Sequence, residues 1–171
     1  MSLLLTVALG AALSWARAHC QTNRWENEVR AFEASDRTNP PPQNAILFIG
    51  SSSIRMWKTL AEDFAGSPVI NRGFGGSQLA DSVAFAERIV LPYRPRQIVL
   101  YAGDNDLAAG LTPAQVLADF QAFVRKVHTT LPKTPIAFIA IKPSPSRWRL
   151  ADRIREANRL VAEATRTNAA L

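Results

Sequence analysis

Three short apolar runs constrain the fold of this chain more than any other feature of its sequence. They are Ala45–Ile49, Gln97–Tyr101 and Ile136–Ile141. A strand that is apolar along nearly its whole length is typical of a parallel sheet covered on both faces. Pro68–Asn71 is a shorter candidate for a further strand. The chain is therefore expected to contain a parallel sheet.

Segments with helical spacing separate these strands. Thr112–Leu131 is the clearest, because Thr112 can act as N-cap, Pro113 fits the first turn and Gln115 completes a capping box. Helices are also predicted at Asn23–Ser35, Leu79–Val90 and Leu150–Thr167. This alternation predicts a three-layer α/β/α sandwich built on a flavodoxin-like parallel sheet. The expected strand order is 2-1-3-4, with the fifth strand missing.

Composition narrows the class of protein. A chain of 171 residues has the length of one domain, and its single cysteine, Cys20, excludes a disulfide framework and a four-thiolate zinc site. The net charge of +6 raises the question of nucleic acid. The arginines near the C-terminus alternate with acidic residues, as Asp152–Arg155, Glu156–Arg159 and Glu163–Arg166. Such i,i+3 pairs predict a solvated, ion-paired helix face, so no nucleic-acid partner is expected.

The N-terminus resembles a targeting segment. Leu3–Trp15 is apolar and uncharged but shorter than the roughly 20 residues of a membrane-spanning helix. Ala16–Ala18 fits a small-x-small cleavage site, which predicts a signal peptide at residues 1–18 and a secreted or periplasmic domain at residues 19–171. A buried N-terminal helix and a lipid anchor at Cys20 are the alternatives. Arg17–His19 is a poor match to a lipidation site.

The loops that follow the first three strands carry the candidate chemistry. They are Gly50–Ser53, Asn71–Ser77 and Gly103–Asp106, and parallel strands bring such loops to one edge of a sheet. A serine at a strand-to-helix turn can act as a nucleophile. Glycine N–H groups and an asparagine amide can stabilise the oxyanion of a tetrahedral intermediate. Together these loops predict acyl-transfer chemistry.

Phe48–Trp57, Asn71–Gly76 and Gly103–Asp106 resemble, in order and spacing, the first three blocks of the SGNH (GDSL) hydrolases. The likeness is closest to the secreted bacterial branch similar to platelet-activating-factor acetylhydrolase subunits. The resemblance implies that Ser52 is the nucleophile and that the Ser52 N–H, the Gly76 N–H and the Asn105 amide form the oxyanion hole. It implies a small-molecule ester substrate and no metal or cofactor.

Two departures from the family pattern matter. Ser51 stands where the family has aspartate, which leaves open whether Ser51, Ser52 or Ser53 is the nucleophile. The family's final Asp-x-x-His block is absent, so we expect an incomplete domain with little esterase activity. His128, inside a predicted helix, and His19 are poor candidates for the base. The alternative function is a non-catalytic α/β binding module.

Other interpretations of these loops are weaker. Gly73–Gly76 lacks the spacing of a dinucleotide or P-loop motif. Asp104 and Asp106 alone make a thin case for a metal site, and a turn role for Asp104 fits better. Pro143–Trp148 follows the fourth strand and is expected to border the same cleft as a substrate wall. Trp57 is a second candidate for that wall, although both tryptophans could instead be packing residues.

Overall fold

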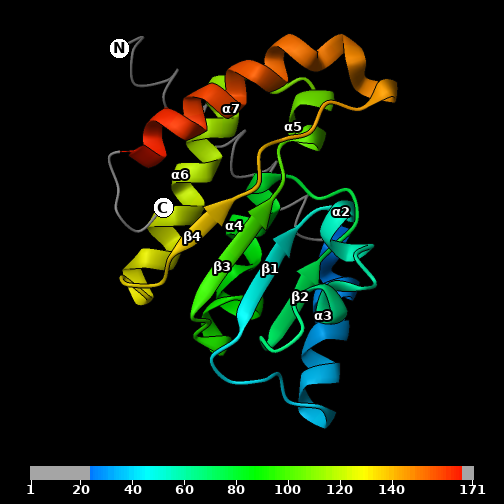
Figure 1. Ribbon diagram of the computed structural model, residues 1–171, viewed down its shortest axis with the longest axis vertical. Helices are drawn as coiled ribbons and strands as arrows, with labels where there is room; N and C mark the ends of the chain where they lie inside the picture. The colour runs from blue at the N-terminus through cyan, green and yellow to red at the C-terminus, as the bar shows by residue number, and fades with distance from the viewer. Residues whose placement is uncertain (1–23, 167–171) are drawn as a thin grey trace, which may run out of the picture.

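The computed structural model describes residues 24–166, so the predicted signal peptide at residues 1–18 lies outside the described residues. Four parallel strands form one sheet in the order β2-β1-β3-β4 (Figure 1). The strands are β1 (Ile46–Gly50), β2 (Val69–Gly73), β3 (Gln97–Tyr101) and β4 (Ile136–Phe138). The predicted α/β class and strand order are confirmed.

Helices connect the strands at close to the predicted positions. Residues 24–38 are helical, three residues beyond the predicted end at Ser35. The others are α2 (Ser52–Arg55), α3 (Leu60–Asp63), α4 (Leu79–Ile89), α5 (Asp104–Ala108), α6 (Pro113–Thr130) and α7 (Ala151–Arg166), with 3-10 turns at η1 (Leu91–Tyr93) and η2 (Pro145–Leu150). The capping box at the start of α6 forms as predicted, because Gln115 N–H donates to the Thr112 hydroxyl at 3.2 Å.

The two faces of the sheet are covered unequally. Alternate residues of β1 point to opposite sides, so Leu47 and Ile49 join a large core with the long helices α4, α6 and α7. Ile46 and Phe48 join a smaller cluster with Ile54 of α2 and other residues of the β1–β2 connection. The predicted three layers are therefore one thick helical layer, the sheet, and one thin layer.

The fourth strand is shorter than predicted. Backbone pairing continues only until the Ile139 N–H donates to the Leu100 carbonyl at 2.9 Å. Beyond it, the Asn158 side chain of α7 takes over both backbone groups of Ile141, accepting from its N–H at 2.8 Å and donating to its carbonyl at 2.9 Å. Ile141 is still buried, which explains why the apolar run extends past the strand.

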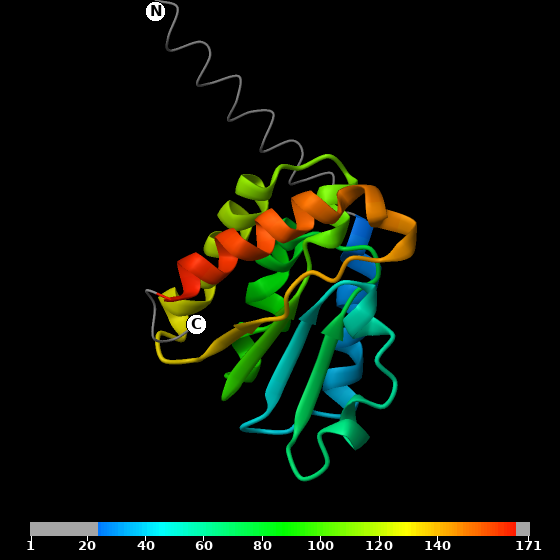
Figure 2. The same cartoon turned by 45° about the horizontal axis from the view of Figure 1, so that its top comes forward.

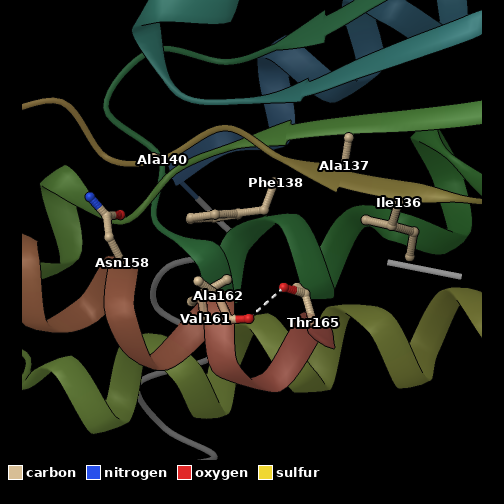
Figure 3. A pocket seen from close by; sticks show the side chains of 8 residues that line it. All are labelled: Ile136, Ala137, Phe138, Ala140, Asn158, Val161, Ala162 and Thr165. Carbon is tan, nitrogen blue, oxygen red and sulfur yellow. Dashed lines mark hydrogen bonds between the residues drawn. The ribbon is translucent and has the colours of Figure 1, made fainter. Parts of the chain in front are cut away.

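A groove of about 310 Å³ lies between β4 and α7 (Figure 3). It is lined mainly by apolar side chains, and Ile136 at the start of β4 lies at the same end as Thr165 in the last turn of α7 (Figure 3). Thr165 uses its hydroxyl within α7, donating to the Ala162 carbonyl at 2.9 Å. In the part of the chain that the structure describes, β4 forms the outer edge of the sheet, as predicted.

The charged face of α7 forms with one change of partner. Two predicted ion pairs are present, Asp152–Arg155 and Glu156–Arg159. The third was wrong, because Glu163 pairs with Arg159 at 2.6 Å and not with Arg166. The Arg159 guanidinium is a fork that reaches one turn in each direction, so it can hold both glutamates. Across residues 24–166, no helix combines the length and the hydropathy required to cross a membrane.

Candidate active site

The carboxyl ends of the first three strands meet in register. Gly50 at the end of β1 pairs with Gly73 of β2 on one side and with Tyr101 of β3 on the other. Past the strands, the Ser51 N–H donates to the Tyr101 carbonyl at 3.0 Å and the Phe74 N–H donates to the Gly50 carbonyl at 2.9 Å. The three candidate loops therefore leave the sheet side by side at the carboxyl ends of the strands (Figure 2).

The serines after β1 differ in accessibility. Ser51 is fully buried, and its hydroxyl has no hydrogen-bond partner among the described residues. Ser52 and Ser53 are partly exposed in the first turn of α2. A nucleophile must reach its substrate, so burial excludes Ser51 and leaves Ser52 and Ser53.

The second loop is tied to the first by Asn71. Its amide donates to the Ile54 carbonyl of α2 at 2.8 Å and accepts from the Gly73 N–H at 2.9 Å. One side chain thus links the end of β2 to the turn that carries the three serines. Gly76 follows with a φ of +80°, in the left-handed region that favours glycine.

Asn105 joins the third loop to the second. Its amide nitrogen donates to the carbonyl of Ser77, the residue after Gly76, at 2.9 Å. Its neighbour Asp106 accepts from the Leu79 N–H at 3.0 Å, which fixes the start of α4. The structure therefore brings Asn105 against the Gly76 loop, while strand pairing places Ser52 two residues beyond the shared strand end.

Arg147 is a contact of this site that the sequence interpretation missed. Its guanidinium donates to an Asp104 carboxylate oxygen at 2.6 Å and to the Asn105 amide oxygen at 2.9 Å. Asp104 therefore forms an ion pair in addition to its place in the first turn of α5. Arg147 belongs to Pro143–Trp148, and the contact places that segment beside the candidate loops, as expected.

The two tryptophans of the predicted substrate wall have different environments. Trp57 packs edge-to-face against Phe48 and Phe64, with ring centroids 5.6 and 5.9 Å apart, and its indole N–H donates to Asp63 at 2.5 Å. Trp57 is thus a packing residue of the thin layer. Trp148 is 63% exposed and stays a candidate for the wall.

His128 lies away from these loops. Its Nε2 is 3.0 Å from the carbonyl oxygen of Thr134, which precedes β4. His128 therefore lies near the amino ends of the strands, whereas Ser52 follows the carboxyl end of β1. Among residues 24–166, no group of three or more His, Cys, Asp or Glu side chains is arranged to hold a metal ion.

Asp106 is a buried acid beneath the site. Burial raises its pKa from 3.8 to about 7, despite the opposing hydrogen bond from the Leu79 N–H. Burial also raises the pKa values of Asp81 and Asp119, whose negative charges reinforce the effect on Asp106. At neutral pH, Asp106 is thus close to its midpoint.

This shift predicts a pH-dependent stability. Between about pH 4 and 7 the folded chain keeps a proton on Asp106 that the unfolded chain has released, so the free energy of unfolding falls as pH rises, by at most about 1.4 kcal/mol per pH unit. Asp106→Asn should make this fall shallower in urea unfolding at pH 4, 5, 6 and 7. Asp152→Asn, which changes an exposed carboxylate, is the control. An unchanged slope in Asp106→Asn would contradict the assignment.

Comparison with known proteins places this arrangement in a family. The profile of the GDSL-like lipase/acylhydrolase family matches residues 49–171, which include all three loops. The chain therefore belongs to the GDSL-like lipase/acylhydrolase family. No curated protein sequence matches that of this chain.

Solved structures share the fold at low sequence identity. A GDSL-like lipase from Bacteroides thetaiotaomicron is 18% identical, with a TM-score of 0.61 over 83% of this chain and 70% of that one. A member of the lipolytic G-D-S-L family from Veillonella parvula is 18% identical, with a TM-score of 0.59 over 72% and 74%. An acetyl xylan esterase, AlAXEase, is 21% identical, with a TM-score of 0.59 over 72% and 73%.

Proposed function

We propose that this protein is a secreted or periplasmic serine esterase that transfers the acyl group of a carboxylic ester to Ser52. In this proposal the Ser52 hydroxyl oxygen attacks the carbonyl carbon. The ester C–O bond then breaks, and the alcohol leaves with the proton that the hydroxyl gave up. The backbone N–H groups of Ser52 and Gly76 and the side-chain amide of Asn105 stabilise the oxyanion. Water then hydrolyses the acyl-serine. No metal or cofactor takes part.

One observation carries the proposal: the bond from the Asn105 amide to the Ser77 carbonyl, at 2.9 Å. It joins two loops that leave the sheet on either side of β1, the strand that leads into Ser52. An amide nitrogen has two hydrogens, and the bond to Ser77 uses one. The proposal assigns the other to the oxyanion.

Short acyl esters are the proposed substrates. Structural neighbours include one named as a GDSL-like lipase and one named as an acetyl xylan esterase. Lysophospholipids and acetylated carbohydrates are therefore the two substrate classes to compare. Partly exposed Ser52 and exposed Trp148 are compatible with a shallow, open site.

A non-catalytic binding module is the second candidate. It is favoured by the position of His128, which contacts the Thr134 carbonyl near the amino ends of the strands. His128 is the only histidine among residues 24–166, so the described residues give Ser52 no imidazole base. An in-frame Asp-x-x-His encoded downstream of codon 171 would favour the esterase.

Replacing Asn105 by alanine tests the oxyanion assignment. The change removes one donor, which is typically worth about 10²–10³ in rate. We therefore expect kcat/KM for p-nitrophenyl acetate to fall by about that factor, measured against the exposed control Asn39→Ala. Equal activity in Asn105→Ala and the control would contradict the assignment. A wild-type chain without turnover would favour the binding module.

A further inference from the structure

Arg147 holds two neighbouring groups of the site with one side chain. One guanidinium nitrogen, Nη1, lies 2.6 Å from Asp104 Oδ2, and the other, Nη2, lies 2.9 Å from Asn105 Oδ1. The side chain is only about one-third exposed, at 32%, and that of Asp104 is 20% exposed. This contact joins the segment after β4 to the start of α5, 42 residues apart in sequence.

The chemistry of this contact fixes the direction of the Asn105 amide. A guanidinium has only donors, so the amide must present its oxygen to Arg147. The amide nitrogen is then turned to the other side, where it donates to the Ser77 carbonyl at 2.9 Å. A rotation of the amide by 180° would set donor against donor at Arg147 and acceptor against acceptor at Ser77.

We propose that Arg147 is a positioning residue for Asn105, an inference that rests on the proposed esterase function. It acts through three effects. It keeps the amide nitrogen on the side of the Gly76 loop. Its positive charge on Oδ1 polarises the amide, which makes the N–H groups stronger donors. Its ion pair with Asp104 offsets a carboxylate beside the place where the oxyanion forms.

Lysine at position 147 should restore only part of the effect of Arg147 on Asn105. The two bonds come from two nitrogens of one planar fork, whereas an ammonium is a single point of charge. Arg147→Lys keeps the charge but loses the geometry that contacts both Asp104 and Asn105. Arg147→Gln loses the charge as well. Arg149→Gln removes the same charge from an exposed arginine of the same 3-10 turn, η2, and is the matched control.

The first readout is the side-chain amide of Asn105 in the ¹⁵N-labelled full chain, assigned as the NH₂ signal pair that Asn105→Ala lacks. This signal does not depend on turnover. We expect Arg147→Gln to shift both protons and to speed their exchange with water, Arg147→Lys to have a smaller effect, and Arg149→Gln to have none. An Asn105 signal that is the same in all four proteins would overturn the inference.

The second readout is hydrolysis of p-nitrophenyl acetate. Misplacing a catalytic donor should lower kcat by about 10- to 100-fold, with KM changed less than about twofold, since the donor acts mainly in the transition state. If Arg147→Gln and Arg149→Gln have the same kcat while Ser52→Ala is inactive, the inference about Arg147 is overturned but the proposed esterase function is not. An amide shift in Arg147→Gln together with full activity in Ser52→Ala would support the contact and reject Ser52 as the nucleophile.

Discussion

Replacing Gly50 by alanine should unfold the protein or destabilise it by about 4 kcal/mol or more, which is at the upper end of single substitutions. Gly50 ends β1 with a φ of +139°, and a Cβ built there lies 1.9 Å from the Tyr101 carbonyl oxygen. No side-chain rotation relieves a clash with backbone. Circular dichroism and urea unfolding measure the loss.

Gly66→Ala is the control for this prediction. Gly66 also has a positive φ, +85°, but a Cβ there has no heavy atom within 4 Å. It should therefore cost only the backbone strain, about 1–2 kcal/mol. If the two variants lose similar stability, the predicted clash between a side chain at Gly50 and the Tyr101 carbonyl is contradicted.

In a chain that carries the family's Asp-x-x-His block, Ser52→Ala should abolish ester hydrolysis. Removing a nucleophile that works together with other catalytic groups typically costs on the order of 10³-fold or more. Because Ser52 is partly exposed on the surface of the α2 turn, the change should leave the free energy of unfolding within about 0.5 kcal/mol. The measurement is the initial rate with p-nitrophenyl acetate at several chain concentrations.

Ser53→Ala is the matched comparison, because Ser53 is also partly exposed in the same turn. It should retain activity within a few-fold of wild type. If Ser53→Ala is inactive and Ser52→Ala is active, the nucleophile is Ser53 and the site must be redrawn around it.

The sheet and the site loops could be predicted because their signals are local. Apolar runs predicted β1, β3 and β4, and the shorter candidate Pro68–Asn71 predicted β2. The residues after β1, β2 and β3 form the three loops that the structure brings together. The end of β4 could not be predicted, because it depends on the side chain of Asn158, 17 residues away from Ile141. An apolar run indicates which residues are buried, and Ile141 is still buried beyond the point where strand pairing stops.

Arg147 shows the same limit within the site. Its segment, Pro143–Trp148, is expected to border the cleft, but nothing in that segment indicates that Arg147 is the residue that contacts the third loop. The contact with Asn105 spans 42 residues and depends on how η2 turns back over α5. The burial of Ser51 beside the partly exposed Ser52 was equally invisible, since the three serines are identical in type.

Ser52, Gly76 and Asn105 are proposed to surround one reacting carbonyl. Methylboronic acid tests this proposal most directly, because it forms a tetrahedral adduct with a serine hydroxyl that resembles the acyl-transfer intermediate. Titrated into the ¹⁵N-labelled chain, it should shift the Ser52 and Gly76 backbone N–H signals and the Asn105 side-chain signals together, with one Kd, and should shift none of them in Ser52→Ala. Shifts confined to one of the three groups, or shifts that persist in Ser52→Ala, would contradict the account.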